Sequence, residues 1–326
     1  MARGGVVRIG TMVVAGVGAL VLIAAGTLAY LTGAGPLPDP SGCTAVVKSR
    51  EVELTTEQAE NAALIVALSV RRGMPARAAS IALATAYQES KIYNIDYGDS
   101  DSLGLFQQRP SQGWGTREEI LDPVYAINAF YDALTRIDDY ETMPITEAAQ
   151  AVQRSAFPDA YADHEDDARV LASALTGETT GGRFSCVRRP DFDEETDDLD
   201  GAGLTPRAAV VREEIEAAFG TQSLGGFAPG GVNEGHMEGS AHYEGRAVDI
   251  FVRPVNAANQ RRGWAMAQYL VAQADRLAIK TVIFDARIWT SGIRSEQGWR
   301  DYEPSGSSGD RAILEHRDHV HVDVED

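Results

Sequence analysis

"PARAASIALATAYQES", residues 75–90, is the stretch of sequence that most constrains the fold. It opens with a proline, which suits the first turn of a helix. The residues that follow are small or apolar on nearly every side. A helix without a polar face must lie away from water, in the centre of a domain. The stretch therefore predicts a buried central helix.

Helical patterns continue on both sides of this stretch. Before it, apolar residues recur at helical spacing from Ala59 to Val70. After it, helix starts are expected at Pro123 and Thr146. Residues 51–177 are therefore predicted to form an all-helical domain.

The second half of the chain has a different pattern. Residues 178–204 include "DFDEETDDLD", with seven acidic residues in ten, which predicts a solvated linker. From 205 to 326 helical segments alternate with the strand-like runs "AVDIFV", "KTVIFD" and "HVHVDV". This region is predicted to be an α+β domain.

Charge and hydropathy indicate where the protein acts. The 326-residue chain has a net charge of −19, which disfavours binding to nucleic acid. Residues 9–31 are uncharged and long enough to span a bilayer, and Arg3 and Arg8 precede them. We expect a single-pass anchor there, a cytoplasmic N-terminus at 1–8, a spacer at 32–50 and both domains outside the cell. A cleaved signal peptide is the alternative.

The chain has two cysteines, Cys43 and Cys186, one on each side of the helical domain. In an oxidising compartment a disulfide would tie the two ends of that domain together. Two free, buried thiols are the alternative.

Glu89 lies at the end of the predicted central helix, where partial burial would raise its pKa and suit it to general acid catalysis. The loop after it carries Asp96, Asp99 and Asp101, any of which could serve as a second carboxylate. The alternative for this loop is an acidic turn without a catalytic role.

Glu89-Ser90 followed by "SLGLFQ", from Ser102 to Gln107, resembles the glutamate-serine and "GLxQ" motifs of lysozyme-like soluble lytic transglycosylases. The resemblance covers about 55–175. It implies that Glu89 protonates the bond between N-acetylmuramic acid and N-acetylglucosamine in peptidoglycan. It also implies that Ser102, Gln107 and Tyr161 line the sugar cleft, although "QRSAFPDAY" is a loose counterpart of the family's tyrosine motif.

Inverting hydrolysis needs a second carboxylate to activate water. Without one, a single acid suits a transglycosylase, which closes an anhydro ring. The sequence leaves lytic transglycosylase and muramidase activity open.

A second set of polar residues indicates a metal site. Three of the six histidines fall within 316–321, and His242 and Asp249 stand upstream in "SAHYEGRAVDI". In a strand, His319 and His321 would share one face while the neighbouring valines face the core. Catalytic zinc takes three such ligands and keeps one position open. His316 and His236 are expected to be solvated or to lie behind the ligands.

The pattern S-x-H-x-x-G-x-A-x-D with a late His-x-His resembles zinc peptidases that include D-Ala-D-Ala carboxypeptidases and lysostaphin-type endopeptidases. The resemblance covers about 205–326 and implies Zn²⁺ bound by His242, Asp249 and His321. Either Asp318 or His319 would act as the base, and position favours Asp318. The carboxypeptidases carry an arginine in an upstream glycine-rich loop that here contains "GGFAPGG".

Together the two resemblances imply a cell-wall hydrolase of actinobacterial type, which cleaves glycan strands and stem peptides of peptidoglycan, and the expected anchor at 9–31 would attach it to the membrane. One alternative is a glycan-cleaving enzyme whose C-terminal domain only binds the wall. Another is a non-catalytic wall-binding scaffold of a secretion or conjugation apparatus.

Overall fold

The computed structural model describes residues 41–326 except 180, 190–191, 194 and 305–308. Ser41–Asp326 form one compact unit. The α-helices are α2 (Thr56–Arg71), α3 (Ala76–Ser90), α4 (Arg117–Leu121), α5 (Pro123–Leu134), α6 (Ile145–Gln153), α7 (Glu165–Leu175), α8 (Pro206–Phe219), α9 (Ala257–Ala272) and α10 (Arg311–Leu314). The strands are β1 (Gly42–Val47), β2 (Arg50–Leu54), β3 (Phe184–Val187), β4 (Ser223–Gly225), β5 (Ala247–Phe251), β6 (Ile279–Phe284), β7 (Arg287–Thr290), β8 (Arg300–Asp301) and β9 (His319–Val324). Short 3₁₀ helices are η1 (Pro110–Gln112), η2 (Ala160–His164), η3 (Ala241–Glu244) and η4 (Ile293–Gln297).

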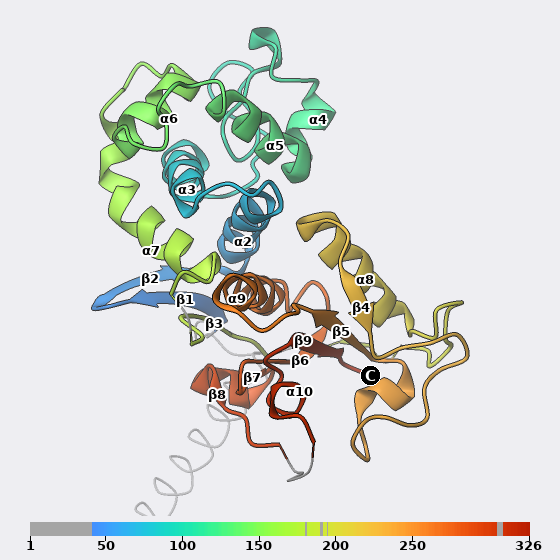
Figure 1. Ribbon diagram of the computed structural model, residues 1–326. Coiled ribbons are helices and arrows are strands. Elements are labelled where there is room, and N and C mark those ends of the chain that lie inside the picture. The colour runs from blue at the N-terminus through green and yellow to red at the C-terminus, as the bar shows by residue number, and fades with distance from the viewer. Residues whose placement is uncertain (1–40, 180, 190–191, 194, 305–308) are drawn as a thin grey trace, which may run out of the picture. The chain divides into compact units, whose positions relative to one another are not determined.

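The predicted central helix is α3, and its residues from Ala78 to Ala86 are all buried. Helices α2, α5, α6 and α7 contact it, as does η2 (Figure 1). Thr55 begins α2 with a capping box: its side chain accepts from the Gln58 N–H, and Gln58 accepts from the Thr55 N–H. Local capping and an apolar centre thus explain this bundle.

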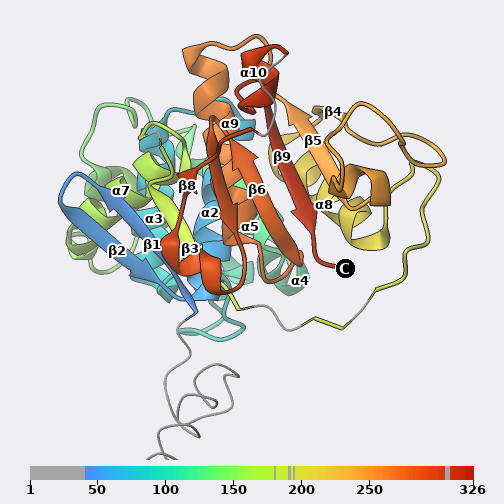
Figure 2. The same cartoon turned by 90° about the horizontal axis from the view of Figure 1, so that it is seen from below.

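The larger sheet has six antiparallel strands in the order β4-β5-β9-β6-β7-β8. The expected strand "HVHVDV" is β9, which lies between β5 and β6 in the middle of the sheet. Val320, Val322 and Val324 of β9 are buried in the core, and α9 packs against β6 and β9. Figure 2 shows this sheet from the face opposite α9.

Helix α9 joins the helical bundle around α3 to the six-stranded sheet. It packs on the sheet with one side and on α2 and α7 with the other (Figure 1). Arg188, which follows β3, is fully buried where the regions meet and donates to the Ala272 carbonyl of α9 at 3.1 Å and to Thr56 of α2 at 2.7 Å. The predicted disulfide is present, since Cys43 of β1 is bonded to Cys186 of β3.

The predicted fold class requires correction, because the described chain is a mixed α/β protein with two sheets rather than an all-α domain beside an α+β domain. The second sheet has the order β2-β1-β3. In the sequence, β1 and β2 precede the helical bundle and β3 follows it. β1 begins within the stretch expected to be a spacer, and β3 falls within the stretch expected to be a linker. The domain boundaries 51–177 and 205–326 stay predictions.

The transmembrane part of the prediction is also corrected. No helix in the described part of the chain combines the length and apolar character that crossing a membrane needs. The longest, α2 and α9, have 16 residues each and include charged side chains, whereas a span needs about 20 apolar residues. The expected anchor at 9–31 lies outside the described residues. The structure therefore gives no support to a single-pass membrane protein or to a membrane localisation.

Candidate functional site

Glu89 lies half-buried in the last turn of α3. The hydroxyl of Tyr161, a buried residue of η2, donates a hydrogen bond to Glu89 Oε1 at 2.7 Å. Burial raises the pKa of Tyr161, and the neighbouring Glu89 carboxylate raises it further. Tyr161 therefore keeps its proton and acts as a donor. The structure brings together these two residues, which lie 72 positions apart in the chain.

The two motifs around Glu89 are joined through Ser90. The Ser90 hydroxyl donates to the Leu105 carbonyl at 2.8 Å, which fixes the "GLFQ" turn against the end of α3. In that turn the side-chain amide of Gln107 donates to the carbonyls of Tyr97 and Gly104, each at 3.3 Å. The local contacts of Gln107 thus stabilise the loop beside Glu89.

The remaining predicted residues of this region are Ser102, Asp96, Asp99 and Asp101. Ser102 is buried in the turn. Asp101 accepts from Arg109 Nε at 2.7 Å and from the Ser111 N–H at 2.8 Å, and these bonds hold its pKa far below the ordinary value. Asp96 and Asp99 are exposed on the loop. Asp101 thus stabilises the loop through its bonds to Arg109 and Ser111.

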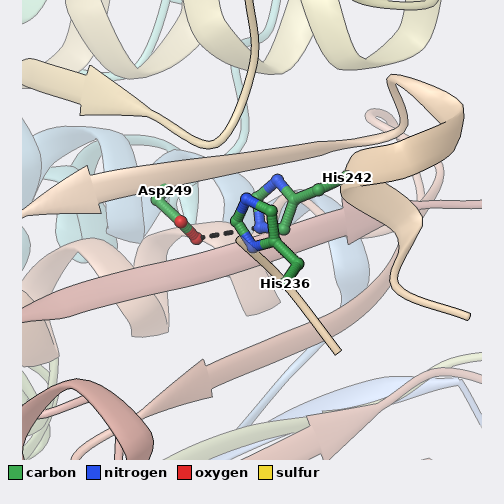
Figure 3. Close-up of side chains that lie close together, drawn as sticks. All are labelled: His236, His242 and Asp249. Carbon is green, nitrogen blue, oxygen red and sulfur yellow. Dashed lines mark ion pairs between the residues drawn. The ribbon is translucent and has the colours of Figure 1, made fainter. Parts of the chain in front are cut away.

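The second set of predicted residues forms a triangle of donor atoms. His242 Nε2 lies 3.2 Å from Asp249 Oδ1 and 3.1 Å from His321 Nδ1, and His321 Nδ1 lies 3.1 Å from Asp249 Oδ1. All three side chains are buried. Asp249 of β5 and His321 of β9 face each other in the antiparallel register, and η3 delivers His242 just before β5. Figure 3 shows His242 beside Asp249.

Further partners orient the two imidazoles. His242 Nδ1 bonds to the Gly226 carbonyl at 2.8 Å, and His321 Nε2 lies 3.3 Å from Asp323 Oδ2. Neither partner was predicted from the sequence. Asp323 could have been found, because it stands two residues from His321 on the same face of a strand. Gly226 carries no comparable signal, since its carbonyl reaches His242 from a loop.

The charges of the triangle favour a cation. Burial opposes ionisation of Asp249, but hydrogen bonds from His242 and His321 outweigh it and hold the pKa of that carboxyl far below its ordinary value. Burial likewise disfavours charge on His321, yet Asp249 and Asp323 raise its pKa to about 9. The set suits zinc, because a buried, ionised carboxylate lies between two imidazoles and the proton held on His321 would be released when a metal binds.

The two candidates for the base, Asp318 and His319, lie side by side. Asp318 Oδ1 is 2.7 Å from His319 Nδ1, and Asp318 Oδ2 accepts from Arg253 Nε at 2.6 Å. Both carboxylate oxygens are thus engaged. His319 Nε2 points toward the triangle and lies 3.8 Å from Asp249 Oδ1. Arg253, just beyond β5, is a further residue that sequence analysis missed.

The two remaining histidines also lie at the cluster. His316 is packed against the His319 ring, with 4.6 Å between centroids, and burial lowers its pKa to about 3. His236 stacks on His242 at 4.0 Å, and burial lowers its pKa too. Among the described residues, the nearest ligand atoms of His236, His242 and Asp249 lie within 4.8 Å of one another (Figure 3). His236 therefore belongs to the metal-binding candidates.

These residues line a cavity of about 690 Å³ on the sheet face opposite α9. The loop at 235–241 forms one wall, and Ile313 and Leu314 of α10 contribute to another. His319 and His321 face into the cavity, while Val320 and Val322 point into the core, as the strand pattern predicts. The cavity is large enough to hold a short segment of a peptide.

Residues 200–312 match the family model "VldE, C-terminal domain". The match includes His236, His242 and Asp249 and ends before Asp318, His319 and His321. A search of curated proteins finds no match to the chain.

Proposed function

We propose that this chain is a peptidoglycan hydrolase whose C-terminal region is a zinc-dependent peptidase. The main support for this proposal is the triangle formed by His242, Asp249 and His321. Zinc bound tetrahedrally at 2.0–2.1 Å requires its ligand atoms to be about 3.3–3.4 Å apart. The three observed separations are 3.1–3.2 Å. The donor set therefore fits zinc with little adjustment.

Zinc held there would polarise the scissile carbonyl and lower the pKa of a bound water. The chain's own residues would manage the proton. Asp318, held by Arg253, fixes the His319 ring through Nδ1, so that His319 Nε2 is directed at the triangle. This arrangement supports His319 as the group that accepts the proton and passes it to the leaving amine. Asp318 orients that imidazole.

A second activity, cleavage of the glycan, is proposed for the helical region. The hydrogen bond from Tyr161 to Glu89 supports it, because it fixes the carboxyl group. Glu89 would give its proton to the glycosidic oxygen as the bond to the sugar's anomeric carbon breaks. Water or the sugar's own hydroxyl would then attack that carbon. Because Asp101 is committed to Arg109, activation of water would fall to Asp96 or Asp99.

Muropeptide analysis of digested sacculi by mass spectrometry tests both activities at once. Wild-type protein should release glycan fragments with anhydro or reducing ends, and these should disappear in Glu89→Gln. Glu147→Gln, an exposed acid of α6, is the matched control and should behave as wild type. Sacculi without new glycan ends after digestion by wild-type protein would refute the glycan activity.

The peptide activity is tested on the same samples. Cut stem peptides should appear with the zinc-loaded protein and be lost in His242→Ala, together with the bound metal. Stoichiometric zinc without cut peptides would favour a domain that only binds the wall. Failure of both activities would favour the non-catalytic scaffold.

A further inference from the structure

His236 lies on a loop that covers the triangle. The loop runs from 226 to 240, between β4 and η3. Five of its residues are glycines at positive φ, namely Gly226, Gly230, Gly231, Gly235 and Gly239. Glycine adopts that conformation without strain, so the loop has many positions at which its path can change. His236 is half-buried, whereas the three residues on each side of it, 233–235 and 237–239, are exposed.

Tyr243 holds His236 beside the metal ligands. The Tyr243 hydroxyl accepts from the His236 N–H at 3.0 Å and donates to the His236 carbonyl at 2.5 Å. Tyr243 is the neighbour of His242 in η3, so one short turn carries a metal ligand and also clamps the backbone of His236. This clamp gives His236 a defined place although the loop around it is glycine-rich.

The distances set His236 apart from the three closer ligands. Its ligand atom lies within 4.8 Å of those of His242 and Asp249, whereas His242, Asp249 and His321 lie 3.1–3.2 Å apart. A tetrahedral fourth ligand would stand about 3.3–3.4 Å from the others. Relative to His242 and Asp249, the His236 ligand atom would have to move closer by at most about 1.5 Å, which a glycine-rich loop can supply.

We propose that His236 is a fourth, loop-borne metal ligand that closes the centre, and that an incoming peptide must displace it. The proposal rests on the metal site put forward above. Four protein ligands make a closed site, whereas a catalytic site needs one open position. The loop at 226–240 therefore works as a gate, and Tyr243 is the positioning residue that favours its closed state.

Cobalt-substituted full-length protein tests the proposal without measuring activity, because the visible absorption of Co²⁺ reports its coordination. Azide binds only where the metal has an open position. Azide should therefore change the spectrum of His236→Ala at a concentration at least roughly tenfold lower than for wild type, since one ligand is lost. Tyr243→Phe should shift in the same direction by a smaller factor. Asn233→Ala, an exposed change in the same loop, should match wild type.

Three outcomes would overturn the proposal. Equal azide affinity in wild type and His236→Ala would show that His236 leaves the metal open, and the peptidase proposal would survive. Azide that affects none of the cobalt-loaded proteins would likewise refute the gate alone. Wild-type protein that binds no Co²⁺ or Zn²⁺ would refute the gate and the metal site together.

Discussion

At the scale of single residues, the bond between Tyr161 and Glu89 gives a sharp prediction. Tyr161→Phe removes the hydroxyl that fixes the carboxyl group while leaving the buried ring in place. Glu89 becomes charged as it gives up its proton, and a hydrogen bond to a charged group contributes about 1.5–3 kcal/mol, so kcat for release of glycan ends should fall roughly tenfold to a hundredfold. Turnover is measured on purified sacculi.

Tyr131 provides the control for this prediction. It is also buried, and its hydroxyl donates to the Ile65 carbonyl at 2.9 Å, within the bundle. Tyr131→Phe should lower the free energy of unfolding by about 0.5–1.5 kcal/mol, the contribution of a bond to a neutral carbonyl, and leave kcat unchanged. Equal loss of kcat in both variants would contradict a specific role for Tyr161.

Gly226 gives a second prediction at this scale. A Cβ at Gly226 would stand 2.2 Å from the His242 ring, so Gly226→Ala must move the imidazole whose Nδ1 the Gly226 carbonyl holds. Loss of such an orienting partner costs roughly 10–100-fold in zinc affinity, measured by competition with a chelator. Gly230→Ala has the same positive φ and meets no atom within 4 Å, so it controls for backbone strain. Equal affinities in the two variants would argue against the orienting role.

At the metal site, the residues predicted from sequence are those that lie close together in the chain or on one strand face. His242 and Asp249 lie on either side of a short turn, and His319 and His321 alternate in a strand, so their spacing indicates convergence. His236 has no such signal. Its place depends on the Tyr243 clamp and on the path of a glycine-rich loop, which only the folded chain reveals.

At the scale of elements, α9 packs closely against the sheet at Gly263. A Cβ there would stand 2.1 Å from the buried Phe284 ring of β6. Alanine favours a helix over glycine by about 1 kcal/mol, but overpacking a core costs about 1–3 kcal/mol. Gly263→Ala should therefore lower the free energy of unfolding, measured by urea denaturation. Adding Phe284→Leu should make the effect of Gly263→Ala less unfavourable, and a simply additive double variant would contradict the contact.

Elements differ in how far sequence could predict them. Helix α3 and strand β9 carry complete local patterns, and both were predicted. The hairpin of β1 and β2 was missed because its turn, with Lys48 at φ 57°, lacks the usual Asn-Gly or Asp-Gly signal. β3 pairs with β1 although the whole helical bundle separates them in the sequence, so no local sequence pattern could predict their sheet.

At the scale of the whole molecule, the packing of α9 means that the two proposed sites share one structural unit. Arg188 illustrates the coupling, since it contacts α2 and α9 and also donates to Cys43 Sγ at 3.4 Å. An acidic stretch was expected to separate two independent domains. Arg188, within the stretch expected to be a linker, is fully buried and contacts both α2 and α9, which composition alone does not indicate.

This coupling leads to a prediction about cooperativity and the disulfide. The bond between Cys43 and Cys186 joins residues 143 positions apart, and closing so long a loop stabilises the folded chain by about 5 kcal/mol in the chain-entropy model. Replacing both cysteines by serine should lower the free energy of unfolding by up to that amount.

The wild type should unfold in urea in one transition, because Arg188 and α9 bind the bundle to the sheet. Far-ultraviolet circular dichroism, dominated by the helices, and tryptophan fluorescence, with three of the four tryptophans at or beyond α9, should give the same midpoint. Separate midpoints for the two probes would show that the bundle and the sheet unfold independently, and that each proposed site could be lost without the other.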